Sequence, residues 1–178
     1  LEMNTRLQVE HPVTEWVTGP DLVRAQLLVA AGEALPWRQD EIVPRGHAIE
    51  CRLYAEEPAH GFRPSVGRVL LLAEPSGPGV RLDSGIVAGD EITMHYDPLL
   101  AKLSVHGPDR AAAIARALAA LRDCALLGVG TNVEYLQAIL DHPAFRQGAT
   151  HTGFLEEHLP DLKPGCPQDE DDALVAAA

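Results

Sequence analysis

The first ten residues of the chain alternate between apolar and polar side chains. The positions on one face are Leu1, Met3, Thr5, Leu7 and Val9, and those on the other are Glu2, Asn4, Arg6, Gln8 and Glu10. A period of two is typical of a strand with one buried face. We therefore predict a half-buried strand or extended ribbon over residues 1–9.

A second alternating segment covers residues 47–56. Its predicted inward positions are Ile49, Cys51, Leu53 and Ala55, and its opposite face carries Glu50, Arg52 and Tyr54. Shorter strand-like pieces follow at residues 68–73, 80–83, 91–95 and 101–106. Glycine- and proline-containing turns separate these pieces, which indicates a small antiparallel sheet or barrel.

Helix signals lie on both sides of this strand-rich region. Thr18 and Asp21 have the spacing of a capping box, and Gly32 is placed to end the helix that they open. Asp109 can cap a helix that runs to about Arg122. The remaining expected helices cover residues 132–141, opened by a Thr131–Glu134 capping pattern, and residues 154–158. Together, the helices and strands predict an α+β fold.

Composition narrows the class of protein. The chain has 178 residues, 46% of them apolar, which is enough for one ordinary core or one domain with an appendage. A formal net charge of −12 argues against nucleic-acid binding and against docking to an anionic membrane. No apolar run approaches the roughly 18 residues of a membrane span, and no secretory signal is present.

The cysteines and histidines show no metal-binding spacing. Cys51, Cys124 and Cys166 lie far apart without a C-x-x-C pair, which favours a reducing, cytosolic setting. Cys51 lies on the predicted inward face of its strand and is therefore expected to be a small core residue. The eight histidines lack an H-E-x-x-H motif or a similar paired arrangement. The sequence therefore gives no reason to expect a zinc site.

The polar face of the N-terminal segment has two interpretations. It can be a solvated sheet edge, which is normal in antiparallel sheets. It can also be a platform for anions and metal. Glu2 and Asn4 offer oxygen ligands for Mg²⁺, Arg6 matches a planar oxyanion, and Glu10 can act as a general base.

Residues 2–15, with the sequence EMNTRLQVEHPVTE, closely resemble the signature of biotin carboxylases near the end of their ATP-grasp domain. Further segments agree in the same order along the chain, at residues 45–52 (RGHAIECR), 55–58 (AEEP), 64–65 (PS), 79–81 (GVR), 95–98 (HYDP) and 101–103 (AKL). The resemblance implies three regions. Residues 1–34 would end an ATP-grasp domain, and residues 35–162 would form a biotin carboxylase C-terminal domain with a small, barrel-sandwich-like antiparallel sheet and flanking helices. Residues 163–178 are acidic and Ala-rich and are expected to be a disordered linker.

The resemblance also implies roles for the N-terminal residues. Glu2 and Asn4 would hold Mg²⁺ or Mn²⁺ against the ATP phosphates. Arg6 would bind bicarbonate, helped by Gln8 and the backbone of Val9. ATP and bicarbonate are thus the implied small-molecule substrates.

Three further residues receive roles in the same way. Glu10 would deprotonate bicarbonate so that it attacks the γ-phosphate of ATP and gives carboxyphosphate. Arg52 would stabilise the enolate-like form of biotin, which is carried on a domain outside this chain. Arg81 would lie at a homodimer interface.

The chain is expected to be part of a longer protein, because Leu1 begins in the middle of a pattern and no Gly-rich phosphate loop is present. It is therefore expected to be inactive alone and to work with a biotin carrier domain and a carboxyltransferase. The segments at 91–98 and 151–154 look most like methylcrotonyl-CoA carboxylase α subunits, with acetyl-, propionyl- and geranyl-CoA relatives open. A cytoplasmic location is expected, or the mitochondrial matrix in a eukaryote. Another ATP-grasp ligase and a non-catalytic assembly module remain as alternatives.

Overall fold

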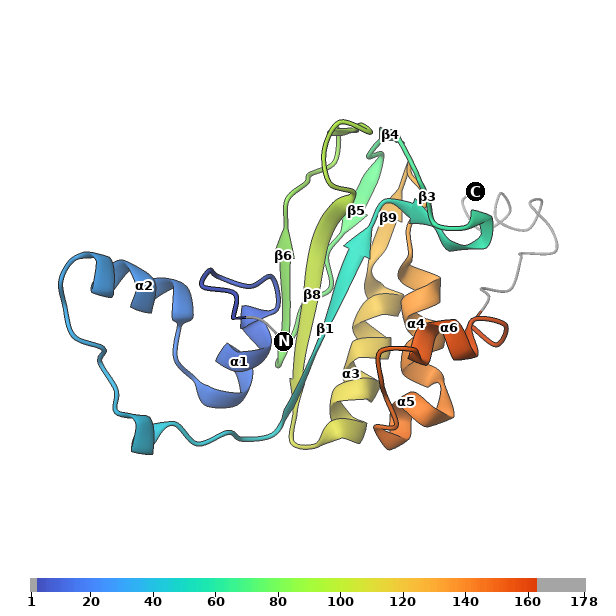
Figure 1. Ribbon diagram of the computed structural model, residues 1–178. Coiled ribbons are helices and arrows are strands. Elements are labelled where there is room, and N and C mark those ends of the chain that lie inside the picture. The colour runs from blue at the N-terminus through green and yellow to red at the C-terminus, as the bar shows by residue number, and fades with distance from the viewer. Residues whose placement is uncertain (1–2, 163–178) are drawn as a thin grey trace.

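A three-stranded antiparallel sheet forms the centre of the fold (Figure 1). The computed structural model describes residues 3–162. The strands lie in the order β1 (His47–Tyr54), β8 (Leu99–Gly107) and β6 (Val80–Ser84). In this register Lys102 on β8 lies opposite Arg52 on β1 and opposite Asp83 on β6. The two faces of the sheet differ sharply in chemistry.

One face of the sheet is apolar and packs against α3 (Arg110–Asp123). The inward positions of β1 are buried as predicted, and Leu103 of β8 is fully buried beside them. The Cys51 thiol is part of this core, and its burial raises its pKa to about 12. Cys51 and Cys124 are free thiols, and Cys166 lies outside the described residues. The predicted core role of Cys51 is confirmed.

Three more helices extend this layer on the same side of the sheet (Figure 1). They are α4 (Val133–Asp141), α5 (Pro143–Gln147) and α6 (Phe154–His158). A second apolar cluster joins them, formed by Tyr135, Phe154 and Leu162. The C-terminal third of the described chain is therefore a helical layer with its own small core.

Short pairs of strands surround the central sheet. They are β2 (Glu56–Glu57) with β3 (Arg63–Pro64), β4 (Gly67–Arg68) with β7 (Glu91–Ile92), and β5 (Leu71–Ala73) with β9 (Ala125–Leu127). Two 3₁₀ turns, η1 (Gln39–Glu41) and η2 (Pro58–His60), complete the secondary structure of residues 3–162. The predicted strand at 68–73 is thus divided, and the one at 91–95 is shorter than expected. The predicted α+β class is confirmed.

The N-terminal part lies on the other face of the sheet. Helix α1 (His11–Thr18) packs on β1 and β8, and α2 (Leu22–Ala30) extends away from it (Figure 1). The Asp21 side chain caps α2 by accepting a hydrogen bond from the Arg24 amide at 2.8 Å. Gly32, with φ +85°, follows the helix in the left-handed conformation that ends it.

The structure corrects the prediction for the N-terminal segment. Residues 3–10 form no strand, and Met3, predicted on the buried face, is 87% exposed. A strand needs a partner for its backbone groups, and the described residues supply none here. The helix predicted from Thr18 begins instead at Leu22, while α1, α5 and β9 were not predicted. Among the described residues, every helix is too short or too polar to cross a membrane.

Candidate active site

The polar face of the central sheet lies beneath α1 and the segment that precedes it. Alternation along three strands places charged side chains in two rows across the sheet. One row is Arg52, Lys102 and Asp83, and the next is Glu50, Ser104 and Arg81. Because Asp83 lies 2.8 Å from Arg81 and 3.5 Å from Lys102, the face carries a connected ionic network rather than a solvated edge.

Glu10 and Arg52 meet at the edge of this network. A nitrogen of the Arg52 guanidinium (Nη2) donates to Oε2 of Glu10 at 2.9 Å, although the residues are 42 positions apart. Both side chains remain about half exposed. The contact therefore brings a carboxylate and a permanent cation together at a surface that a ligand can reach.

Lys102 fixes the backbone beside Glu10. Its ammonium donates to the carbonyl oxygen of Val9 at 2.8 Å and lies 3.5 Å from the Asp83 carboxylate. Burial alone would raise the pKa of Asp83, but Arg81 and Lys102 outweigh it and hold that pKa below its ordinary value. Asp83 is thus a fixed anion that orients the two cations next to it.

A second ion pair attaches α1 to the sheet. Arg81 donates to Glu15 at 2.7 Å and to Asp83 at 2.8 Å, and Glu15 in turn accepts from the Leu22 amide at the start of α2. Trp16 adds a hydrogen bond to Ser104 at 3.3 Å. Through these contacts α1 holds the segment that carries Glu10 in place over the sheet.

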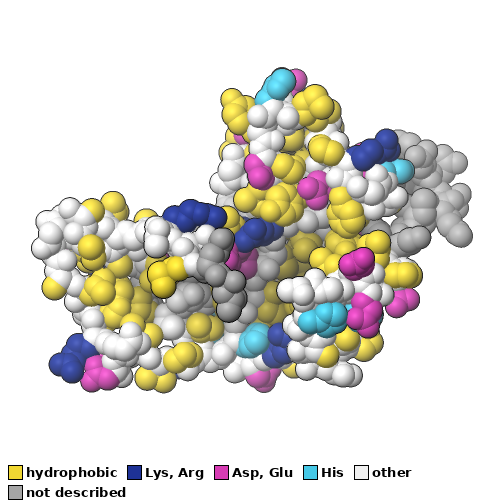
Figure 2. Space-filling view, in the orientation of Figure 1, with side chains coloured by type: hydrophobic (Ala, Val, Ile, Leu, Met, Phe, Trp, Pro, Cys, Tyr) yellow, Lys and Arg dark blue, Asp and Glu magenta, His cyan; other side chains and the backbone are white. Residues whose placement is uncertain are grey.

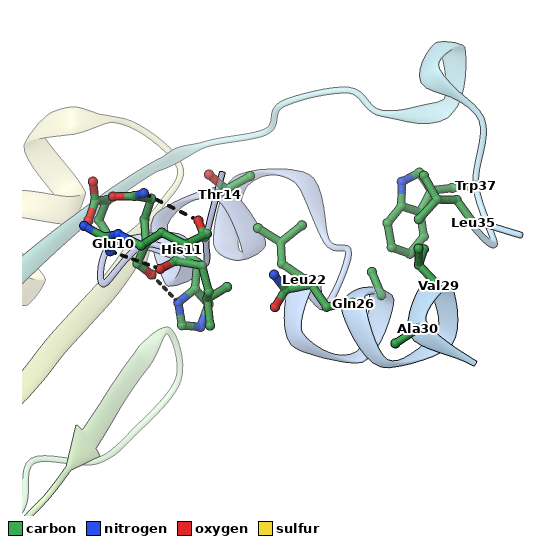
Figure 3. A pocket seen from close by; sticks show the side chains of 13 residues that line it. Glu10, His11, Thr14, Leu22, Gln26, Val29, Ala30, Leu35 and Trp37 are labelled. Carbon is green, nitrogen blue, oxygen red and sulfur yellow. Dashed lines mark hydrogen bonds between the residues drawn. The ribbon is translucent and has the colours of Figure 1, made fainter. Parts of the chain in front are cut away.

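A cleft of about 780 Å³ opens beside this segment (Figure 3). Glu10 and His11 stand at one end of it, and the apolar side chains around Leu35 and Trp37 stand at the other. Arg6 and Gln8 also line it. The polar end of the cleft therefore presents a guanidinium, an amide and a carboxylate to one space.

The N-terminal backbone is shaped by short local contacts. The His11 ring bonds to the Gln8 carbonyl at 2.8 Å, and Pro12 stands in the first turn of α1. Among residues 3–162, the side chains of Arg6 and Gln8 make only long contacts to neighbouring carbonyls, at 3.4 and 3.5 Å. Their polar ends are therefore available to bind a ligand.

The structure brings most of the predicted site residues together. Arg6, Gln8 and Glu10 line the cleft, and Arg52 contacts Glu10. Asn4 is exposed, and Glu2 lies outside the described residues. Arg81 bonds within the chain, with 38% of its side chain exposed. The roles of all these residues remain predictions.

Sequence reasoning missed four members of the network, which are Glu15, Glu50, Asp83 and Lys102. Lys102 and Ser104 alternate with buried residues in the predicted strand 101–106, so the pattern places both on the polar face. Glu50 was placed on that face too, but without a role. The alternating pattern does not specify the register between strands, and it is this register that decides which of these charges become neighbours.

Glu50 is the most deeply buried carboxylate of the network. Its side chain is 5% exposed, and its closest contact to Arg52 is 3.8 Å, beyond hydrogen-bonding distance. Burial raises the pKa of Glu50 above its ordinary value, and Lys102 and Arg52 only partly oppose this shift. The site therefore contains, next to Glu10, one carboxyl whose pKa is raised by burial.

Residues 50–157 match the model of the biotin carboxylase C-terminal domain, and residues 1–38 match that of the carbamoyl-phosphate synthase L chain ATP binding domain. The chain therefore belongs to the biotin carboxylase family. The resemblance seen in the N-terminal signature is confirmed by these matches.

Individual relatives also support membership of this family. A biotin carboxylase from Nostoc sp. is 52% identical over 88% of this chain, and the methylcrotonoyl-CoA carboxylase subunit alpha from Mus musculus is 46% identical over 92%. These matches span 35% and 23% of the two relatives, so the chain covers about a third or less of their length.

Solved structures agree in fold. The biotin carboxylase domain dimer of the Hydrogenobacter thermophilus 2-oxoglutarate carboxylase, in complex with MgADP, ADP and bicarbonate, has a TM-score of 0.88 and 44% identity. That similarity covers 91% of this chain and 36% of the other. A complete pyruvate carboxylase from Rhizobium etli has a TM-score of 0.92 and 40% identity, over 98% of this chain and 17% of the other.

Proposed function

We propose that this chain forms one wall of the active site of a biotin carboxylase, which uses ATP to carboxylate biotin with bicarbonate. The observation that carries the proposal is the 2.9 Å contact between Glu10 and Arg52 beside the cleft that Arg6 and Gln8 line. It joins the proposed base and the proposed charge-stabilising residue on one surface, next to groups suited to an oxyanion.

Bicarbonate binding is assigned to Arg6, Gln8 and the backbone of Val9. A guanidinium fork matches a planar oxyanion, and an amide can add a further donor. The fit is supported by the polar ends of Arg6 and Gln8, which within the described part of the chain have only long contacts to nearby carbonyls. Lys102, by holding the Val9 carbonyl, fixes the orientation of the adjoining peptide.

Glu10 is assigned as the general base. A carboxylate at this position accepts the bicarbonate proton, after which the oxyanion attacks the γ-phosphate of ATP to form carboxyphosphate with release of ADP. Arg52 then stabilises negative charge on the ureido oxygen of biotin, because its guanidinium keeps its charge throughout. The ion pair between the two residues holds the base and the stabilising cation next to each other.

Mg²⁺ or Mn²⁺ would be held by Glu2 and Asn4, whose oxygen atoms are the ligands such ions prefer. When bound, the ion neutralises phosphate charge on ATP. Asn4 is exposed to solvent, which suits contact with a nucleotide. ATP and biotin themselves would be supplied by parts of a longer protein and by a biotin carrier domain.

The proposal extends to the assembly, the location and the acyl acceptor of the full-length protein. We propose a homodimer that works with a biotin carrier domain and a carboxyltransferase, in the cytoplasm or in the mitochondrial matrix. Methylcrotonyl-CoA is the proposed acyl acceptor, although relatives named for pyruvate and propionyl-CoA reach 49% and 44% identity. The match to the biotin carboxylase C-terminal domain disfavours the alternative of a different ATP-grasp ligase.

The test is bicarbonate- and biotin-dependent ATP cleavage by the full-length protein that contains this chain. We expect Glu10→Gln to lower kcat by about a hundredfold or more, the usual contribution of a general base. The matched control is Glu156→Gln, an exposed carboxylate on α6, which should leave turnover unchanged.

Three outcomes would contradict the proposal. Absence of ATP cleavage by the full-length wild-type protein would favour the non-catalytic assembly module. Normal turnover by Glu10→Gln would place the base elsewhere. The 178-residue chain alone is expected to show no turnover, so measurable ATP cleavage by it would contradict the assignment of this chain as a single wall of the site.

A further inference from the structure

Three potential metal ligands meet in the helical layer, far from the site described above. His142 joins α4 to α5, His158 ends α6, and Asp161 lies in the turn that follows. One ligand atom from each of these residues lies within 4.8 Å of the other two. Two imidazoles and one carboxylate thus converge from separate positions in the chain.

The backbone holds these residues in place. The His142 amide donates to the Ala138 carbonyl at 3.1 Å, and its own carbonyl accepts from the Arg146 amide at 3.0 Å. The Asp161 amide donates to the His158 carbonyl at 2.9 Å. Each potential ligand therefore comes from a backbone position fixed by regular hydrogen bonds.

The His142 ring gives an independent indication of a ligand. Its Nδ1 atom is buried and has no hydrogen-bond partner among residues 3–162, which is unfavourable for a polar atom. Ring contacts account for the ring positions, since the His142 and His158 centroids lie 4.3 Å apart at a tilt of 40° and Phe154 packs edge-on to both. These contacts do not account for the buried ring nitrogen of His142 or for the nearby carboxylate.

We propose that His142, His158 and Asp161 bind a divalent transition-metal ion of the zinc class, with water completing the coordination. Neutral imidazole nitrogens and one carboxylate oxygen are ligands that Zn²⁺ takes, whereas Mg²⁺ and Ca²⁺ favour oxygen alone. In a tetrahedral zinc site the ligand atoms are about 3.4 Å apart. Asp161 is exposed, so rotation of its side chain can close the remaining gap.

A bound ion would link α6 and its following turn to the junction of α4 and α5. Such a link would close the 142–158 loop and hold Phe154 and Leu162 in the second apolar cluster. The site is not recognisable in the sequence, because fifteen residues separate the two histidines and no motif joins them. The inference is independent of the proposed carboxylase function.

The test is Zn²⁺ titration of the full-length protein after chelator treatment, followed by calorimetry. Excess Mg²⁺ is kept present so that oxygen-ligand sites are filled. We expect wild type to bind one Zn²⁺ that His158→Gln and Asp161→Asn each weaken on the order of tenfold or more, at least the effect of losing a supporting contact. His151→Gln is the matched control, because His151 also lies beside α6 but pairs with Glu157 at 3.2 Å.

A second readout separates metal binding from local packing. Co²⁺ bound by the three residues should give visible d–d absorption in wild type and in His151→Gln, and this absorption should be lost in His158→Gln. Equal Zn²⁺ affinity in wild type, His158→Gln and Asp161→Asn would overturn the proposal. An equal loss in His151→Gln would overturn it as well.

Discussion

At the scale of single residues, Glu50 is the carboxylate of the polar network with the most deeply buried side chain. Neither of its carboxylate oxygens has a hydrogen-bond partner in the described part of the chain. Burial raises its pKa, with Lys102 and Arg52 only partly compensating. Because the folded-state pKa lies above that of the unfolded chain, the stability linked to Glu50 is present at low pH. It is lost as pH rises through the folded-state pKa.

This environment predicts that Glu50→Gln stabilises the protein at alkaline pH. The variant should gain about 1 kcal/mol in free energy of unfolding at pH 8, the order of the penalty for a buried polar group without a partner. The gain should shrink towards pH 4, where the wild-type carboxyl is protonated. Denaturant unfolding at several pH values measures it, with Glu156→Gln as the exposed control. A less stable Glu50→Gln at pH 8 would mean that attraction to Arg52 and Lys102 outweighs the cost of burial.

Residue-level predictions from the sequence succeeded where alternation alone decides the outcome. The pattern over 47–56 placed Arg52 on the polar face of its strand, and the structure agrees. The pattern did not reveal that Arg52 meets Glu10, because that contact depends on how α1 packs against the sheet. Lys102 was overlooked for the same reason, since its partner is the Val9 carbonyl, 93 positions away.

At the scale of elements, local signals predicted several of the helices and the central strands. The helix expected from Asp109 is α3, and the one expected at 154–158 is α6. The strand predicted at the N-terminus is absent from residues 3–10, because an alternating pattern identifies a buried face but does not provide a neighbouring strand to pair with. Helix α1 was missed, and its N-cap residue Glu10 makes no side-chain capping bond.

The cap of α3 provides a prediction at this scale. The Asp109 side chain accepts from the Ala112 amide at 2.8 Å, and α3 covers the apolar face of the central sheet. Asp109→Ala should therefore lower the free energy of unfolding by about 1 kcal/mol, whereas Asp109→Asn, which keeps an accepting oxygen, should lose less. Thermal or denaturant unfolding distinguishes the two. Equal losses in both variants would show that charge rather than capping matters at this position.

At the scale of the whole molecule, the N-terminal part depends on α1 for its position. Helix α2 extends from it and exposes much apolar surface, including Leu27 at 68%, and hydrophobic side chains gather on that lobe (Figure 2). The link between this lobe and the sheet runs through Glu15, Arg81 and Asp83. The sequence could not predict this link, because it joins α1 to β6 across 66 positions of the chain.

Arg81 therefore has two candidate roles, as an internal link and as the predicted dimer contact, and paired variants separate them. Glu15 is the matched partner because its side chain is only 13% exposed and points into the chain. If Arg81 also contacts a second copy, Arg81→Ala should weaken the dimer of the full-length protein in sedimentation velocity, while Glu15→Gln should leave it intact. Both variants should unfold more easily, because each breaks the 2.7 Å ion pair by an amount on the order of 1 kcal/mol. Unchanged sedimentation of Arg81→Ala, with a stability loss equal to that of Glu15→Gln, would restrict Arg81 to joining α1 to the sheet.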